Sequence, residues 1–462
     1  MNKEHANDLP GTDQQAREIA LRVLKDLEEK QTYANLAMNK VLNRLSLSGV
    51  ERALLTELVY GTTQRRNTLD WVLSLFLKQP LDKLTTWIRN ILRLGVYQIL
   101  FLDRVPEMAA VDESVKLAHK FGHKGVAGLT NAVLRKVSAE KNALPWPSKV
   151  EQPEEYLSIY HAYPLWMVQR WLSRLGFEET EALCRSGNEA PPLTVRTNTL
   201  RISKKELKKE LIHEGVESRD CRYSPFGLYL SLKGNLTGLK SYQEGLFQVQ
   251  GESSMLVSPL LNPQPGDYVL DACSAPGGKA VHMGMLMNNQ GKIVASDLYA
   301  QRLKLVNDAA ERQGVSIIST ERFDGRNIPS HLKGQFDRVL LDVPCSGLGV
   351  IRRKSDLKWR REPKDIPALQ SLQMELLRET YSALKPGGVL VYSACTLEPE
   401  ETDQVIEWFL SKEQSARPAL LSPLLPRELA DAETEEGILK LWPHKTNLEG
   451  FFIAKIRKGA NM

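Results

Sequence analysis

The stretch from residue 268 to residue 287 constrains the fold of this chain more than any other part of the sequence. It opens with three apolar residues and Asp271, continues through the turn 272–279, which holds Gly277 and Gly278, and closes with an apolar stretch that predicts a helix. A strand, a glycine-containing turn and a helix in this order form the first unit of a doubly wound α/β sheet. The small residues of such a turn let the backbone approach a nucleotide-like ligand.

Changes in periodicity divide the whole chain into three predicted domains. Apolar residues recur at helical spacing through residues 1–142, which predicts an all-α bundle. A proline-rich stretch then precedes residues 150–245, where a helical pattern and several alternating patterns predict a small α/β domain. In residues 246–462, short apolar runs alternate with helical patterns, which predicts a parallel sheet with crossover helices. We expect the strands of this sheet at residues 268–271, 292–296, 317–320, 337–341, 389–393 and 451–455.

Composition excludes several classes of protein. Apolar residues make up 42% of the 462 residues and charged residues 25%, as in an ordinary globular protein. No apolar run approaches the ~20 residues of a membrane span, and the first residues lack the apolar segment of a secretory signal. Five cysteines occur without a C-x-x-C pair, which predicts neither a metal site nor a disulfide framework. We therefore expect a cytoplasmic protein without a membrane or metal partner, acting as a monomer, and its net charge of +5 permits a nucleic-acid partner.

Acidic residues stand at or just after the carboxyl ends of four predicted strands, where a doubly wound sheet binds its ligand. They are Asp271, Asp297, Asp324 and Asp342. A single aspartate at such a point is more often a cap or turn residue, but four in register with a glycine turn favour a nucleoside ligand. The turn lacks the G-x-G-x-x-G pattern of a pyrophosphate site, so the first hypothesis for the ligand is S-adenosylmethionine.

Two cysteines follow predicted strands at the same edge of the sheet, Cys345 and Cys395. A lone cysteine there would usually be a small buried apolar residue, but two of them beside a cofactor favour thiol chemistry. Carbon 5 of cytosine is a poor nucleophile, and a thiolate that adds to carbon 6 makes it reactive toward a sulfonium methyl group. A carboxyl group near ring nitrogen 3 would stabilise the developing charge, and a second thiol could assist release of the carbon 5 proton.

These residues lie in segments that resemble motifs of the RNA 5-methylcytosine methyltransferases. Residues 271–279 resemble the first motif of the family, residues 342–347 the fourth and residues 392–395 the sixth. The resemblance implies that Cys395 is the nucleophile, that Cys345 helps to release the product and that Asp342 lies near the base and the cofactor. It also implies contacts with S-adenosylmethionine at Cys273, Ser274, Ala275, Pro276, Gly277, Gly278, Lys279, Asp297, Asp324 and Asp342. The family usually has Thr before the nucleophile, where this chain has Ala394, so a hydroxyl that could orient the thiol is absent.

The resemblance covers nearly the whole chain. Residues 350–359 are similar to a signature of the bacterial branch of this family that acts on 16S ribosomal RNA, and residues 441–444 and 450–455 are similar to the C-terminal end of that branch. The helical region resembles the NusB fold through residues 109–115 and 130–136. The resemblance thus implies a NusB-like RNA-binding bundle, a small α/β middle domain and a C-terminal Rossmann-like domain that uses S-adenosylmethionine to methylate 16S ribosomal RNA.

A basic segment follows Cys345 and is a candidate RNA contact. We expect phosphate contacts or stacking from Arg352, Arg353, Lys358 and Trp359, whereas a solvated charged face is the alternative interpretation. Two other functions stay open at this point. The same chemistry could act on transfer RNA, or the chain could be a non-catalytic NusB-like RNA-binding or antitermination protein. Retention of both cysteines and all four strand-end aspartates speaks against the second.

Overall fold

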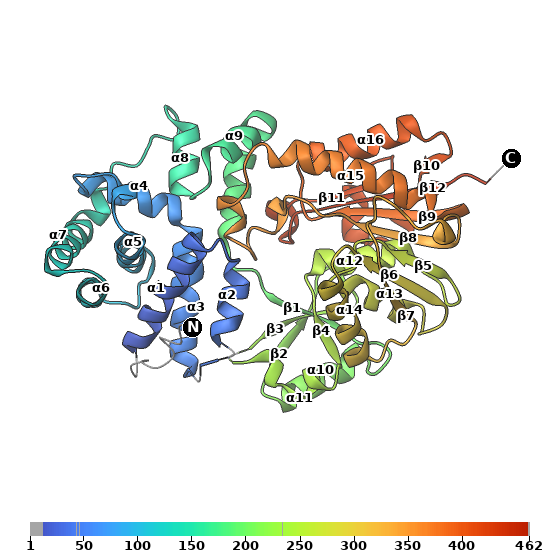
Figure 1. The fold of residues 1–462 in the computed structure, drawn as a ribbon, viewed down its shortest axis with the longest axis horizontal. Helices are drawn as coiled ribbons and strands as arrows, with labels where there is room; N and C mark the ends of the chain where they lie inside the picture. Colours follow the sequence, from blue (N-terminus) through green and yellow to red (C-terminus); the bar gives the residue numbers. More distant parts are fainter. Residues whose placement is uncertain (1–12, 43, 46, 233, 461–462) are drawn as a thin grey trace, which may run out of the picture. The chain divides into compact units, whose positions relative to one another are not determined.

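The computed structural model describes residues 13–460 except residues 43, 46 and 233. By its internal contacts the chain divides into two compact units (Figure 1). The first unit comprises Met1–Glu189 and Arg353–Arg360, and the second comprises Ala190–Arg352 and Arg361–Met462. The division by contacts falls at Glu189, since the helix Pro153–Tyr160 contacts the helix Arg66–Phe76 of the bundle and the helix Leu165–Asn188 contacts Pro153–Tyr160. The predicted domain bounds 1–142, 150–245 and 246–462 stay a prediction. Asn67 donates from its side-chain amide to the carbonyl of Ser158, 3.0 Å away, within this first unit.

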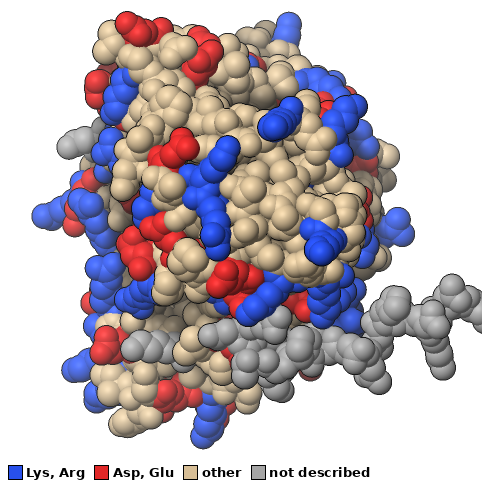
Figure 2. Space-filling view, turned by 90° about the vertical axis from the view of Figure 1, so that its left-hand side faces the viewer, with Lys and Arg blue, Asp and Glu red and all other residues tan. Residues whose placement is uncertain are grey.

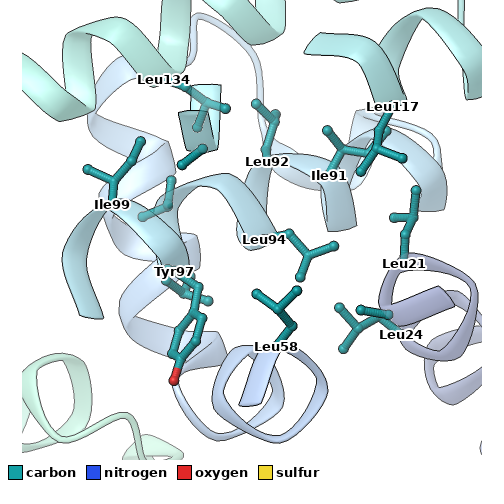
Figure 3. Packing of buried hydrophobic residues seen from close by; sticks show 14 of the residues in the cluster. Leu21, Leu24, Leu58, Ile91, Leu92, Leu94, Tyr97, Ile99, Leu117 and Leu134 are labelled. Carbon is teal, nitrogen blue, oxygen red and sulfur yellow. The ribbon is translucent and has the colours of Figure 1, made fainter. Parts of the chain in front are cut away.

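The first unit is helical, and its central helix is α5 (Thr86–Phe101), which is buried along most of its length. Leu94 of this helix points toward Leu58 and Leu24 in the apolar core (Figure 3). An extended run of apolar residues on one helix is typical of the middle of a bundle. The other helices of this unit are α1 (Asp13–Glu29), α2 (Ala34–Leu42), α3 (Gly49–Gln64), α4 (Arg66–Phe76), η1 (Leu81–Lys83), α6 (Glu107–Phe121), α7 (Lys124–Glu140), η2 (Lys141–Ala143), α8 (Pro153–Tyr160), α9 (Leu165–Asn188) and η6 (Leu357–Trp359).

The second unit begins with a small antiparallel sheet in the order β2-β3-β1-β4. A capping box at Ser203 and Glu206 starts its main helix, whose Leu207 and Leu211 face the sheet. These elements are β1 (Leu193–Thr197), α10 (Lys204–His213), β2 (Glu217–Asp220), β3 (Gly227–Ser231), η3 (Leu236–Gly238), α11 (Lys240–Gln243) and β4 (Phe247–Val249).

The larger sheet of the second unit has the order β10-β12-β9-β8-β5-β6-β7, with β11 paired to β12. Its strands are β5 (Tyr268–Asp271), β6 (Lys292–Asp297), β7 (Ile318–Arg322), β8 (Phe336–Asp342), β9 (Leu384–Ala394), β10 (Ala416–Pro418), β11 (Ile438–Leu441) and β12 (Phe451–Lys458). Pairing is parallel from β7 through β9, as predicted, whereas β12 runs antiparallel to β9. The strand β12 follows β11 after one short connection and pairs with it antiparallel, so it enters the sheet in the opposite direction.

Helices cover both faces of this sheet (Figure 1). Alternate residues of a strand face opposite layers: Leu270 packs with residues of α15, whereas Val269 packs with residues of α12 and α13. The helices are α12 (Glu252–Leu261), α13 (Gly278–Leu286), α14 (Ala300–Gln313), η4 (Ser330–Leu332), η5 (Leu348–Val350), α15 (Asp365–Ser382), η7 (Pro399–Glu401), α16 (Asp403–Lys412), η8 (Ser422–Leu424), η9 (Arg427–Ala432) and α17 (Pro443–Thr446). The chain leaves β5 toward β6 on one side, and β8 lies on the other side of β5, so a topological switch point lies between β5 and β8.

Candidate active site

In the turn between β5 and α13, one position, Gly277, has a backbone conformation and surroundings that suit only glycine. Gly277 has a φ of 97°, and a Cβ atom there would lie 2.9 Å from the Cα of Val306. Both the left-handed conformation and the close approach of another backbone exclude a larger residue. The turn thus brings main-chain atoms of residues 272–279 to the carboxyl edge of the sheet, as the sequence predicted.

A cavity of about 220 Å³ lies against this turn. Its lining includes most of the predicted cofactor contacts, namely Cys273, Ser274, Ala275, Pro276, Gly278, Lys279 and Asp342. It also includes Asp271, one of the four strand-end aspartates, and residues that the sequence did not indicate, namely Gln248, Val249, Gln250, Gly251 and Ser254. These five residues run from β4 to the first turn of α12, outside the recognised motifs, and no sequence signal pointed to them.

Asp271 is the most unusual group in this lining, because its carboxylate is buried and has no hydrogen-bond partner among the described residues. Burial, and after it the negative charge of Asp342, raise its pKa to about 7. The hydroxyl of Ser274, also buried, likewise has no partner in the described part of the chain. Buried polar groups are normally paired, so these two groups suit a polar, positively charged ligand.

Asp342 ends β8 and is held on both sides. One carboxylate oxygen accepts a hydrogen bond from the Ser393 hydroxyl, 2.7 Å away, and the other lies 2.6 Å from the ammonium group of Lys279. Ser393 stands two residues before Cys395, so Asp342 connects the cavity to the segment that carries the predicted nucleophile. A charge-assisted pair of this kind fixes the orientation of the carboxylate.

The two predicted thiols meet. The sulfur atoms of Cys345 and Cys395 lie 3.0 Å apart, although the residues are fifty positions apart in the sequence. The hydrogen bond to Cys395 is the largest cause that raises the pKa of Cys345 well above its ordinary value, and burial adds to it. Cys345 therefore stays protonated and can donate its S–H to the sulfur of Cys395. A donor of this kind favours negative charge on the Cys395 sulfur.

The structure places the other predicted acidic contacts outside the lining of the cavity. Asp297 is buried, accepts from the backbone N–H of Tyr299 and pairs with Arg302 at 2.9 Å. Asp324 pairs with Arg326 at 2.7 Å, and the hydrogen bonds from this side chain lower its pKa. Their contacts with a cofactor stay predictions. Burial raises the pKa of the Cys273 thiol, which lies in the lining of the cavity.

The prediction that the basic segment presents its side chains to RNA is wrong for Lys358. This side chain is fully buried, with its ammonium group 3.2 Å from the side-chain oxygen of Asn188 and 4.0 Å from the centre of the Tyr163 ring. The indole N–H of Trp359 donates to the carbonyl of Thr63 at 2.6 Å, in the same helical unit.

The guanidinium of Arg352 is also buried, and it donates to the carbonyl of Asn447 at 3.0 Å in the second unit. Arg352 and Lys358 are therefore structural residues, because carbonyl, amide and aromatic groups of the protein already surround their charges. Arg353 is partly exposed, and its contact with RNA stays a prediction.

Figure 2 shows one face of the molecule coloured by charge. Lys and Arg side chains lie between Asp, Glu and uncharged side chains on this face, and they form no continuous basic patch among the residues it describes. Within the described ranges, no helix is long and apolar enough to cross a membrane. No group of three or more His, Cys, Asp or Glu residues in those ranges could hold a metal ion.

Comparison with known families matches three consecutive parts of the chain. Residues 14–139 match the NusB family, residues 163–237 match a ferredoxin-like domain of RsmF/B-like methyltransferases, and residues 258–457 match the family described as 16S rRNA methyltransferase RsmB/F. The predicted architecture of a NusB-like bundle, a small α/β domain and a methyltransferase domain is thereby confirmed.

Individual relatives match along most of their length. A protein of Bacillus subtilis strain 168, named probable ribosomal RNA small subunit methyltransferase B, is 39% identical over 96% of this chain and 98% of its own. A solved structure described as PH0851 is 28% identical, covers 98% of this chain and 100% of its own, and has a TM-score of 0.82. A structure of NSun6 from Pyrococcus horikoshii with SFG, an analogue of S-adenosylmethionine, is 25% identical over 63% of this chain and 97% of its own, with a TM-score of 0.57.

Proposed function

The chain belongs to the 16S rRNA methyltransferase RsmB/F family, and we propose that it methylates carbon 5 of a cytosine in 16S ribosomal RNA, with S-adenosylmethionine as methyl donor. The observation that carries this proposal is the pair of thiols 3.0 Å apart, at the ends of two neighbouring strands and close to a carboxylate-lined cavity. A single thiol would serve many enzymes, but two facing thiols suit a reaction that must both form and break a bond to sulfur.

The cavity residues fit the proposed cofactor. S-adenosylmethionine supplies an electrophilic methyl group on a sulfonium and carries a second positive charge on its amino group. Asp271 has a buried carboxylate without a partner among the described residues, and the Ser274 hydroxyl beside it is likewise unpaired there. Ionised Asp271 would hold a cationic group in this cavity and be relieved of its desolvation cost by it. The main chain of residues 272–279 would lie close against the rest of the ligand.

Cys395 is the proposed nucleophile. Its sulfur, as the thiolate, forms a bond to carbon 6 of the cytosine, and the electron pair of the 5,6 double bond moves to carbon 5 and ring nitrogen 3. Bound S-adenosylmethionine would supply the methyl group that carbon 5 takes, and the electron pair of the broken methyl–sulfur bond would stay on the cofactor sulfur. Asp342, whose carboxylate is fixed by Lys279 and Ser393, would accept a hydrogen bond from ring nitrogen 3 after that nitrogen takes a proton from solvent, which stabilises the adduct.

Cys345 is the proposed product-release group. The proton on carbon 5 must then be removed. The electron pair of the carbon 5–hydrogen bond restores the 5,6 double bond, and the carbon 6–sulfur bond breaks and returns the thiolate of Cys395. Because Cys345 faces Cys395 as a thiol, it would first donate a hydrogen bond to the Cys395 thiolate. Once the Cys395 sulfur is bonded to carbon 6, Cys345 would pass its own proton to water and, as a thiolate, accept the carbon 5 proton. The target cytosine must leave any stacked helix to reach these atoms, so an unpaired or flipped base is expected.

Methylation of defined RNAs tests this proposal. Purified protein is incubated with tritiated S-adenosylmethionine and unmodified 16S ribosomal RNA or bulk transfer RNA, and bisulfite sequencing then locates any 5-methylcytosine. We expect one cytosine of the 16S RNA to be methylated, with no product from Cys395→Ala and full activity from the control Cys221→Ser, whose thiol lies in the small domain. Methylation of transfer RNA alone would mean that transfer RNA, and not 16S ribosomal RNA, is the substrate. Turnover by Cys395→Ala would exclude Cys395 as the nucleophile and with it the proposed mechanism.

A further inference from the structure

A buried carboxylate lies between the two cysteine loops and has no part in the chemistry described above. Glu401, at the end of η7, is fully buried, and burial raises its pKa. Both of its carboxylate oxygens accept hydrogen bonds, one from the residue that follows Cys345 and the other from the residue that follows Cys395. A buried acid is costly, so such a group is kept in place only by good partners.

On the Cys345 side, the contacts are short and involve the main chain. The backbone N–H of Ser346 donates to Glu401 Oε2 at 2.8 Å, and Gln373 Nε2 donates to the same oxygen at 3.0 Å. Gln373 also donates to the carbonyl of Pro344 at 3.0 Å, so the peptide groups before and after Cys345 are both tied to this network. These bonds fix the backbone that carries the thiol.

On the Cys395 side, the contact is longer and goes through a hydroxyl. Thr396 Oγ1 donates to Glu401 Oε1 at 3.3 Å and accepts from the hydroxyl of Ser346 at 3.0 Å. The Tyr392 hydroxyl donates to the main-chain carbonyl of Glu401 at 2.7 Å, which anchors the short helix to β9. Residues directly after each cysteine therefore bond to each other and to one carboxylate.

We propose that Glu401 is a positioning residue that holds the Cys345 thiol against the Cys395 sulfur, an inference that rests on the proposed two-thiol mechanism. Its shorter, charge-assisted bond goes to the loop of Cys345, so loss of Glu401 acts mainly on that thiol. Displacement of a reacting group by about 1 Å is enough to slow a step by about 100-fold. The step slowed most is release, because there Cys345 must accept the carbon 5 proton, whereas in addition it only donates a hydrogen bond to the Cys395 sulfur.

The test measures the covalent complex between protein and RNA, which a merely structural role would not increase. Glu401→Ala is incubated with S-adenosylmethionine and 16S ribosomal RNA, and the complex is resolved on a denaturing gel beside turnover and cofactor affinity. We expect the complex to rise about fivefold and turnover to fall at least about tenfold, while the dissociation constant for S-adenosylmethionine stays within about twofold of the original. Glu407→Ala, which removes an exposed carboxylate on the adjoining α16, is the matched control and should behave as the original protein.

Two further variants separate position from folding. Glu401→Gln should restore turnover to within about threefold, because its amide oxygen can accept from Ser346 and Gln373 and its amide N–H can donate to Thr396. Should Glu401→Ala not fold, Glu401→Asp carries the same expectation, since its carboxylate keeps the charge but falls one methylene short of Ser346. Release as fast as in the original protein by Glu401→Ala or Glu401→Asp overturns the inference, and so does lost turnover without complex at unchanged cofactor affinity.

A parallel assay of Cys345→Ala distinguishes failure of this inference from failure of the proposed function. If Cys345→Ala accumulates the complex and the Glu401 variants do not, only the positioning part of Glu401 is lost. If Cys345→Ala accumulates none and turns over normally, the two-thiol mechanism itself is lost, and with it the reason for holding the thiols together.

Discussion

The glycine turn 272–279 and the basic segment 352–361 both stand out in the sequence, yet they differ in how far the sequence predicts their surroundings. The turn lines a cavity at the carboxyl edge of the sheet, as its residues predict. In the basic segment, by contrast, Arg352 and Lys358 are buried, and the indole N–H of Trp359 donates to the backbone carbonyl of Thr63. The turn is defined by backbone geometry, which residue type and spacing report directly. The segment is defined by charge, and charge alone does not say which way a side chain points.

The backbone requirement of the turn gives the largest expected effect. Gly277→Ala should lower the free energy of unfolding by about 3 kcal/mol, because alanine is strained at this positive φ and its Cβ would overlap the main chain at Val306. Urea unfolding measures the loss. The control Gly128→Ala lies on α7 with open space around it, and we expect it to be neutral or up to about 1 kcal/mol more stable. Equal stability of the two variants would remove the argument from backbone geometry.

The buried lysine tests the other side of the comparison. Lys358→Ala should cost about 2 kcal/mol, since it removes the contacts with Tyr163 and Asn188, whereas Lys358→Met should cost less because its chain fills the same space. Lys354→Ala, at an exposed position of the same segment, should leave stability unchanged. If Lys358→Met instead keeps stability and weakens RNA binding with a smaller salt dependence, the original RNA interpretation of this residue returns.

The same lysine predicts a pH dependence of stability. Burial lowers its pKa well below 10.5 in the folded chain, so the unfolded chain binds more protons between the folded value and 10.5. Its contribution to the free energy of unfolding therefore rises with pH through that window. Lys358→Met should lose this rise, as thermal unfolding at a series of pH values would show. An unchanged pH profile would mean that Lys358 is solvated in the folded protein.

Asp271 lies beside the turn in the lining of the cavity, and its substitution should give a smaller, pH-dependent effect. Its pKa is raised from 3.8 to about 7, so its contribution to stability is complete below 3.8 and is lost as the pH rises through about 7. Asp271→Asn should abolish that loss, leaving the ligand-free variant about 1 to 3 kcal/mol more stable at pH 8 relative to the original protein. Calorimetry should also show weaker binding of S-adenosylmethionine by the variant. An equally tight complex at pH 8 would exclude Asp271 from cofactor binding.

Arg361 ends the basic segment and gives the smallest expected effect. Its guanidinium donates to the carbonyls of Ser346 at 2.8 Å and Cys345 at 3.1 Å, so it supports the loop that carries the Cys345 thiol. A lysine can make only one of these bonds in the same geometry, and Arg361→Lys should lower turnover by about three- to tenfold without changing cofactor affinity. Single-turnover methylation measures it, and a change confined to RNA affinity would show that Arg361 contacts RNA instead.

Features set by backbone geometry could be predicted from the sequence, whereas the surroundings of charged side chains could not. The six expected strands and the meeting of Cys345 with Cys395 could be predicted because strand ends in a parallel sheet share one edge. The place of Glu401 could not, because its partners come from three separate segments and nothing in the acidic stretch 398–401 marks this glutamate as the one between the two cysteine loops. The burial of Lys358 was likewise invisible, since its aromatic and amide partners lie some 170 to 195 positions earlier in the chain.

The central claim is that one thiol attacks the base and the other releases it. The most direct measurement is mass spectrometry of the RNA–protein complex that Cys345→Ala forms with S-adenosylmethionine and 16S ribosomal RNA. We predict a peptide that carries a 5-methylcytosine nucleotide on the sulfur of Cys395, in a complex that persists after denaturation. A nucleotide on any other residue, or methylated RNA released at the original rate without a complex, would contradict the account.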